Sequence, residues 1–404
     1  MKPLALIYIG ASQLQLPAIH WAKKMGLEVL VTDSNPDAPG IRFADEYRQL
    51  DGSDVDGLLR FAQEITKRHT LVACYCGSDF GLAAVAAISA RFRLPAVSEV
   101  VTKLALNKAK AKEVLQRAGI GIPQGVCVRS VSELDLVIKS LGLPVIIKPV
   151  DSSGSRGVCT VIHRNQLADA FSKAQRYSEQ VMVESVIEGD HIDVNGVYID
   201  DYFYPCGLLD RYFSSQPFNY PIWGCQPCCL SEDVRVKVYA AVDAGARALG
   251  IHIGPVKADV IVENGSPVIL EIGPRFHGDV STSFVSPLLT NNQSAPQVWF
   301  AYLAGKAFKV FLPTENENIL AGWMAIFPDS GGYFESIDGI EAASAVDGIT
   351  QIRTLKNPGY RVDAVADNLA VLGFIWAIAS NKILLKQRLD EARQLLIVRM
   401  GTKK

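Results

Sequence analysis

Short apolar runs alternate with amphipathic segments in the first quarter of the chain. The run at 4–9 is apolar throughout, which is typical of a strand buried in a parallel sheet, and a tight turn at 10–12 leads into a helical pattern at 14–25. The same succession recurs, with strands expected at 28–32 and 71–76 and helices at 55–68 and 80–92. This order predicts a doubly wound α/β domain over residues 1–95.

The turn after the first strand reads Gly10-Ala11-Ser12 and lacks the GxGxxG spacing of dinucleotide-binding domains. A tightly bound nicotinamide cofactor is therefore not indicated. A nicotinamide-dependent oxidoreductase that uses this domain is kept as an alternative.

A loop rich in serine and glycine follows the apolar strand that ends at Lys148, and a second strand starts at Val158. Small residues let the backbone N–H groups approach a phosphate closely, and the lysine adds a positive charge. An ordinary solvent-exposed hairpin loop is the alternative. The loop residues that this phosphate hypothesis uses are Ser152, Ser153, Gly154, Ser155 and Gly157.

The surrounding pattern predicts a small α+β unit and then a larger sheet. Strands at 180–184 and 192–199 alternate apolar and polar residues, as antiparallel strands do. The segment 211–230 is irregular and aromatic, which favours either a substrate-binding lid or a long insertion. Helices are expected at 107–118, 132–141, 166–177 and 232–249.

An Asn264-Gly265 pair between two apolar runs predicts a β-hairpin, with Asp259 and Glu271 on opposite arms. Two carboxylates that face one another are costly unless a cation joins them, and magnesium prefers such oxygen ligands together with substrate phosphates. The alternative is that one of the two faces solvent. Arg275 follows four residues after Glu271, where an arginine suits a developing anionic charge.

Composition restricts the class of function. The chain has 404 residues, 49% of them hydrophobic, so two or three domains are expected. Forty basic and 42 acidic residues give a net charge of −2, which provides no electrostatic footprint for nucleic acid or an anionic membrane. No apolar run reaches about eighteen residues and no signal-peptide pattern opens the chain, so a cytoplasmic location is expected.

Eight cysteines are too few for a disulfide scaffold in a chain of this length. Cys225, Cys228 and Cys229 form a CxxCC motif that raises the possibility of zinc, but no second pair with ligand spacing follows. Ordinary thiols are the preferred interpretation, and a role for them in a pocket stays open.

In their order and spacing these motifs resemble the ATP-grasp superfamily of carboxylate–amine (amino-acid) ligases over most of the chain. The matching features are Ala44–Glu46, the helix that starts at Asn107-Lys108, the "IIKP" strand with its Ser/Gly loop, the "VE…IEG" turn at 183–189, the acidic hairpin and "EIGPR" at 271–275.

The resemblance implies roles for individual residues. Lys108 and Lys148 would hold the α and β phosphates of ATP, and the loop 152–157 would close over the γ phosphate. The hinge at Val183–Val186, which contains Glu184 and Ser185, would read adenine, and His191 would lie at the ribose. Asp259 and Glu271 would bind Mg²⁺ or Mn²⁺, and Arg275 together with Lys148 would be catalytic.

One residue departs from the family pattern. Gly273 stands where the family usually has an asparagine that binds the metal, so that ligand is missing or is replaced by water or another side chain. A non-catalytic nucleotide-binding protein is therefore one alternative to an active enzyme.

The implied fold is an N-terminal Rossmann-like domain (1–95), an ATP-grasp domain (96–312) with a mobile lid at about 108–178 and a large subdomain at 179–312, and a C-terminal α+β, β-rich domain (313–404). The implied reaction activates a carboxylate as an acyl-phosphate and joins it to an amine, releasing ADP and phosphate. A purine-pathway or bicarbonate-using carboxylase of the same fold is the alternative. Expected partners are a small-molecule carboxylate and amine, and a homodimer is the assembly that relatives often form. Position alone suggests substrate contacts for the stretches 211–229 and 276–284, with Arg211, Arg275, His277 and Gly278 as candidates.

Overall fold

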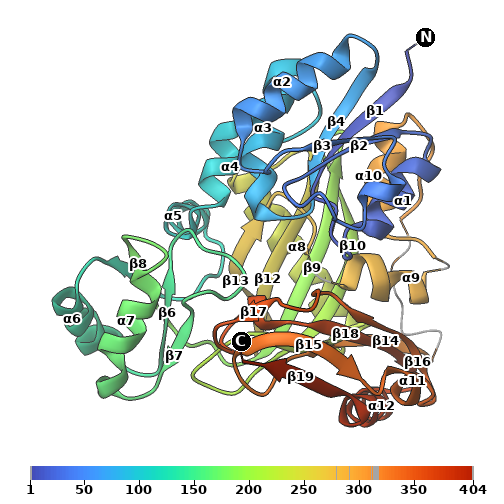
Figure 1. Ribbon diagram of the computed structural model, residues 1–404. Coiled ribbons are helices and arrows are strands. Elements are labelled where there is room, and N and C mark those ends of the chain that lie inside the picture. Colours follow the sequence, from blue (N-terminus) through green and yellow to red (C-terminus); the bar gives the residue numbers. More distant parts are fainter. Residues whose placement is uncertain (1, 279, 291, 311, 313–317, 403–404) are drawn as a thin grey trace.

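A four-stranded parallel sheet forms the N-terminal part of the computed structural model, which describes residues 2–278, 280–290, 292–310, 312 and 318–402 (Figure 1). Its order is β3-β2-β1-β4. Leu6 and Tyr8 of β1 pack in a core with α1, whereas Ile7 and Ile9 pack in another with α2 and α3, so helices cover both faces. This confirms the doubly wound prediction, to which the structure adds β3. The elements are β1 (Leu4–Ile9), α1 (Leu16–Lys24), β2 (Glu28–Asp33), β3 (Glu46–Gln49), α2 (Val55–Thr66), β4 (Thr70–Cys76), α3 (Leu82–Phe92) and α4 (Glu99–Ala105).

A second, antiparallel sheet of order β5-β8-β6-β7 lies beside the first part of the chain, at the left of Figure 1. The predicted hairpin around the Ser/Gly loop is confirmed, because Val145 of β6 pairs with Val161 of β7. The sheet also includes 181–185, which lies outside the predicted lid range. Its elements are α5 (Lys108–Arg117), β5 (Gly125–Val128), α6 (Val131–Leu141), β6 (Val145–Pro149), β7 (Cys159–Val161), α7 (Leu167–Gln175) and β8 (Val181–Ser185).

The largest sheet has eight strands in the order β13-β12-β9-β10-β11-β14-β18-β16. Helix α8 packs its buried Val238 and Val242 against this sheet beside Ile269 and Ile272 of β13. The elements of its first half are β9 (Asp190–Ile199), β10 (Tyr202–Phe213), β11 (Pro221–Gln226), α8 (Glu232–Ala248), β12 (Gly254–Glu263), β13 (Ser266–Gly273), α9 (Ser286–Leu289) and α10 (Ala295–Leu303).

The prediction of an irregular segment over 211–230 was wrong at 211–213 and 221–226, which are strands. Residues up to Phe213 continue β10, and Pro221–Gln226 form β11, which joins the two halves of the large sheet. Aromatic residues are common in strands, and here Tyr212 and Trp223 stack as cross-strand partners with ring centroids 4.1 Å apart. The two strand portions therefore belong to the large sheet, and residues 214–220 connect them.

The C-terminal part shares the large sheet with the central part. Strand β14 pairs with β11, so the sheet crosses the predicted boundary at 312/313, next to residues 313–317, which lie outside the described residues. Its last helix spans Lys382–Leu395 and is followed by a strand. The elements are β14 (Leu320–Ile326), β15 (Gly332–Asp338), α11 (Ile340–Ser344), β16 (Ile349–Thr354), β17 (Arg361–Val362), β18 (Gly373–Ala379), α12 (Lys382–Leu395) and β19 (Ile397–Gly401), with β17, β15 and β19 in a separate sheet.

Within the described ranges, every helix is too short or too polar to pass through a lipid bilayer.

Candidate active site

Two lysines and one glutamate form a buried ionic group between α5 and the small sheet. The Lys148 ammonium lies 2.7 Å from Glu184 Oε2, and the Lys112 ammonium contacts Glu184 Oε1. Burial favours the protonated acid, but Lys148 and Lys112 hold the pKa of Glu184 below its usual range. Burial, and then the nearby Lys148 charge, lower the pKa of Lys112 to about 7. We call these three residues the lysine cluster; it has more positive than negative groups.

Lys108 connects the Ser/Gly loop to the central hairpin. It is the first residue of α5, whose N-cap Asn107 accepts a hydrogen bond from the Lys110 backbone N–H at 3.0 Å. The Lys108 ammonium donates to the Ser152 carbonyl at 2.5 Å and lies 3.2 Å from Glu271 Oε2. A lysine at a helix N-terminus opposes the helix dipole, so its position is explained by these contacts rather than by helix stability.

The Ser/Gly loop contains backbone that favours glycine. Gly154, Ser155 and Gly157 have φ angles of 69°, 61° and 71°. A Cβ at Gly157 would lie 2.9 Å from the Tyr177 ring and 3.2 Å from the Ala174 backbone, so a side chain there is also excluded by space. The Gly154 carbonyl accepts a hydrogen bond from the Asn368 N–H at 3.3 Å, which brings the loop tip against the C-terminal part.

Carboxylates from three adjacent strands lie in one row across the large sheet. Asp259 of β12 pairs directly with Glu271 of β13 on one side and with Asp193 of β9 on the other. Directly paired residues point to the same face of an antiparallel sheet, so the three side chains share a face. We call these three residues the carboxylate cluster.

Lys257 lies on the same strand, two residues before Asp259, and points to the same face. Its ammonium is 3.0 Å from Asp259 Oδ2 and 2.6 Å from Glu271 Oε1. Burial opposes its charge, but the two carboxylates raise the pKa of Lys257 above its usual value. Lys108 and Lys257 in turn hold the pKa of Glu271 well below its usual range despite burial. The hairpin therefore contains ionised carboxylates.

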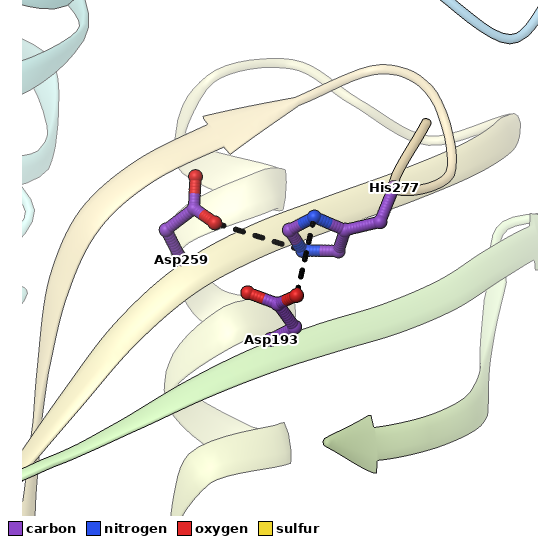
Figure 2. A group of neighbouring side chains, drawn as sticks. All are labelled: Asp193, Asp259 and His277. Atoms are coloured by element: carbon purple, nitrogen blue, oxygen red, sulfur yellow. Dashed lines mark ion pairs between the residues drawn. The ribbon is translucent and has the colours of Figure 1, made fainter. Parts of the chain in front are cut away.

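Figure 2 shows how Asp193, Asp259 and His277 approach one another. The His277 ring nitrogens lie 3.8 Å from Asp193 Oδ2 and 3.7 Å from Asp259 Oδ1, and burial lowers the pKa of His277 to about 3. Within the described part of the chain, this is the one group of three or more histidine, cysteine, aspartate or glutamate side chains that are close enough to share a metal ion. Arg211 already lies against it, 2.5 Å from Asp193 and 3.9 Å from Asp259, which makes a cation shared by all three unfavourable.

Arg275 forms a two-point ion pair with the N-terminal domain. Its Nε and Nη2 atoms donate to the two Asp79 oxygens at 2.5 and 2.8 Å. Asp79 precedes α3, and both side chains are largely buried. Arg275 and Pro274 also line a cavity with Tyr75 and Cys76 of β4. The arginine thus lies at the junction of two domains, with its guanidinium plane fixed by a carboxylate.

Two family models match separate parts of the chain. The model described as D-ala D-ala ligase C-terminus matches residues 115–211, and the model described as L-amino acid ligase C-terminal domain 2 matches residues 324–401.

The proteins that are similar in sequence are distant relatives. A protein of Sinorhizobium fredii named uncharacterized protein y4rH is 23% identical over 350 residues, which cover 83% of this chain and 70% of the relative. A D-alanine–D-alanine ligase of an Azoarcus species is 28% identical over 221 residues, 52% of this chain and 66% of that enzyme.

A solved structure matches the whole fold. The crystal structure of L-amino acid ligase from Bacillus licheniformis aligns with a TM-score of 0.82 at 20% identity, covering 100% of both chains. The chain therefore has the fold of an amino-acid ligase of known structure, which agrees with the ATP-grasp resemblance of its motifs.

The donor set of the hairpin fits magnesium. Asp259 and Glu271 are opposed on the hairpin and partly exposed, and they offer the hard oxygen ligands that Mg²⁺ or Mn²⁺ takes. Gly273, which pairs with Lys257, adds no ligand. Two carboxylates and no amide therefore make up the hairpin's contribution.

Several residues predicted for the ATP-grasp site lie close together. Lys108 contacts both the loop and Glu271, and Lys148 lies with Glu184. The backbone of Glu184 pairs with both β5 and β6, Ser185 pairs with β6, and Val186 follows the end of β8. Within the predicted hinge, Val186 is therefore the residue beyond the sheet.

The structure divides the predicted substrate residues into two groups, with Arg211 and His277 beside Asp193 and Asp259, and Gly278 beside Arg275. Arg211 lies in the ion pair with Asp193, and His277 is buried, with its N–H donating to Asn195 Oδ1 at 2.9 Å. His191 packs on Phe213, with ring centroids 4.8 Å apart. Among the four candidates for substrate contact, only Arg275 lines the cavity at the domain junction. Gly278 has no room for a side chain there, since a Cβ would lie 2.9 Å from the Gly77 carbonyl.

Four residues of the site were not predicted from the sequence: Lys112, Lys257, Asp193 and Asp79. Lys112 follows Lys108 by one helical turn, and Lys257 precedes Asp259 by two residues, so helix and strand periodicity could have placed both beside predicted residues. Asp193 is a polar residue between the apolar Ile192 and Val194 of β9, which is a weaker signal for a site residue. No sequence signal marks Asp79 as a site residue, because only the tertiary fold brings it to Arg275.

The CxxCC cysteines lie away from the carboxylate cluster. All three are free thiols; Cys225 and Cys228 are buried, and Cys229 is exposed. Burial raises the pKa of Cys228 to about 12. The Cys229 thiol lies 3.5 Å from the Lys382 ammonium.

Proposed function

We propose that this ATP-grasp chain is an ATP-dependent carbon–nitrogen ligase. It activates the carboxylate of a small molecule, for which an amino acid is the first candidate, as an acyl-phosphate. An amine then attacks to form an amide or peptide bond, and ADP and phosphate are released. The ligase names of the relatives support this reaction class.

The observation that carries the proposal is the direct pairing of Asp259 with Glu271 beside the Lys108 ammonium. A carboxylate is a poor electrophile until its oxygen becomes a good leaving group, and phosphoryl transfer requires positioning and charge neutralisation. A bound Mg²⁺ or Mn²⁺ would neutralise phosphate charge at these carboxylates.

The chain's own residues would bind the phosphates, exclude water and stabilise the developing charge. Lys108 and Lys148 would bind phosphate oxygens, and the loop containing Ser152, Ser153 and Gly154 would cover them and exclude water from the acyl-phosphate. Arg275, held by Asp79, would stabilise the negative charge that develops on the substrate.

The test is phosphate release from ATP and Mg²⁺ with a panel of L- and D-amino acids and small carboxylates, followed by mass analysis of the products. In a parallel assay, hydroxylamine replaces the amine and traps the acyl-phosphate as a hydroxamate. Turnover that needs both a carboxylate and an amine supports the proposal. A protein that binds no Mg-ATP with any member of the panel contradicts it.

A bicarbonate arm tests the carboxylase alternative. ATP turnover stimulated by bicarbonate alone, without hydroxamate from any amino acid, would assign the chain to carboxylation. The L-amino acid ligase model that matches residues 324–401 favours amide formation.

A further inference from the structure

Lys257 and Gly273 are cross-strand partners on the metal hairpin, and they fit each other sterically. A Cβ at Gly273 would lie 3.2 Å from Lys257 Cε and 3.5 Å from its Cγ. The lysine stem therefore occupies the space that a side chain at 273 would enter. An asparagine at 273 would press on this stem, so an amide ligand there and Lys257 in its present position disfavour each other.

The Lys257 ammonium lies between the two carboxylates that would hold a metal. It contacts one oxygen of each, Asp259 Oδ2 at 3.0 Å and Glu271 Oε1 at 2.6 Å. Lys257 is 5% exposed. If a metal ion displaced it from both carboxylates, a buried ammonium would lose its counter-ions, and that is strongly unfavourable.

Glu271 uses its two oxygens for two different cations. Oε1 faces Lys257, and Oε2 faces Lys108, which also reaches the Ser/Gly loop. A carboxylate that bridges two cations is the arrangement of a two-metal phosphoryl-transfer site. Here the cation at Oε1 is the buried Lys257, whereas the cation at Oε2 is Lys108, which is less buried and also contacts the loop that would cover the phosphates.

We propose that the Lys257 ammonium permanently fills one of the two cation positions of this hairpin, so that the site takes a single divalent cation together with the nucleotide. Gly273 is then the steric counterpart of Lys257 and not a lost ligand. This inference rests on the proposed function, because the cation is the one that would accompany ATP.

The test counts the Mn²⁺ ions bound per chain by electron paramagnetic resonance, with the full-length protein saturated by a non-hydrolysable ATP analogue. One Mn²⁺ per chain is expected for the native protein. Two would overturn the inference, because Lys257 would then be a counter-ion that moves aside. No bound Mn²⁺ in a chain that holds the analogue would overturn it as well.

A double variant sharpens the count. Lys257→Ala with Gly273→Asn removes the ammonium and supplies an amide, and two Mn²⁺ per chain are expected. The matched control Lys386→Met removes a lysine of α12 that pairs with Asp390, and this variant should still bind one Mn²⁺ per chain. A double variant that folds, by circular dichroism, and still binds one ion contradicts the inference; if it does not fold, the native count decides.

The outcomes separate the two proposals. Failure of the native chain to bind the analogue contradicts the proposed function, and this inference with it. Binding of the analogue with two Mn²⁺ overturns only the single-cation site.

Discussion

The lysine cluster and the carboxylate cluster are both groups of ion pairs, but the first contains one carboxylate and the second contains three. In the lysine cluster, Glu184 lies between two ammonium groups. The carboxylate cluster sets Asp193, Asp259 and Glu271 against Lys257 and Arg211. Lys108 contacts the second group and the loop between them.

This difference shows what each region can bind. A buried carboxylate with two lysines leaves a positive charge that an anion such as phosphate would satisfy, whereas three carboxylates on one face of a sheet offer the oxygen ligands that a divalent cation takes. Phosphate and a divalent cation are the parts of Mg-ATP. Clusters of partly or fully buried ionisable groups of this kind are found more often at binding and catalytic sites than elsewhere.

The largest effect is expected at the carboxylate cluster. Glu271→Gln keeps the shape of the side chain but removes the charge that holds a cation, so kcat should fall by about 10²–10³-fold. Phosphate release at saturating ATP measures it, with circular dichroism as the check on folding. A loss of less than tenfold would remove Glu271 from the metal site.

A smaller effect is expected at the lysine cluster. Lys148→Met removes one charged contact to phosphate and leaves Glu184 with Lys112 alone, so the Kd for ATP should rise by about 10–100-fold. Titration calorimetry measures it. The control is Lys139→Met, an exposed lysine of α6 that should leave the Kd unchanged. If Lys148→Met and Lys139→Met had the same Kd for ATP, a phosphate-binding role for Lys148 would be contradicted.

Asp79 should influence the reaction only through Arg275. Asp79→Asn weakens the two-point ion pair, and we expect kcat to fall by about tenfold with the KM for ATP unchanged, since Arg275 loses its orientation and not its charge. Asp79→Glu should restore part of the rate. A change in the KM for ATP alone, or no rescue by glutamate, would point to a structural role.

The smallest expected effect is on stability and concerns Lys112. Its folded pKa of about 7 lies below the value of about 10.4 in an unfolded chain, so between these two pH values the unfolded state binds more protons. Stability should therefore rise with pH from about 7 to about 10, by at most about 1.4 kcal/mol per pH unit.

Thermal unfolding across this pH range, compared with Lys112→Met, measures the contribution of this lysine. The variant should lack that part of the rise. Identical pH profiles for the two proteins would show that Lys112 titrates normally in the folded state.

Local patterns predicted much of the fold because they record nearest-neighbour physics. The apolar run at 4–9 and the Asn264-Gly265 turn each define an element within a few residues, and both are found as expected. The strands within 211–230 were not predicted, since Tyr212 and Trp223 pair only when two strands meet. The continuity of the large sheet through β11 and β14 likewise depends on partners about a hundred residues apart.

By itself, the sequence determined the doubly wound N-terminal domain, the Ser/Gly hairpin after Lys148 and the opposition of Asp259 to Glu271. These follow from strand periodicity and turn chemistry, which act over short stretches of chain. Only the tertiary structure decided that Lys112 shares Glu184 with Lys148, that Asp79 holds Arg275, and that Lys257 fills the space beside Gly273. Buried charges select partners by distance and desolvation, and distance between remote residues exists only once the chain has folded.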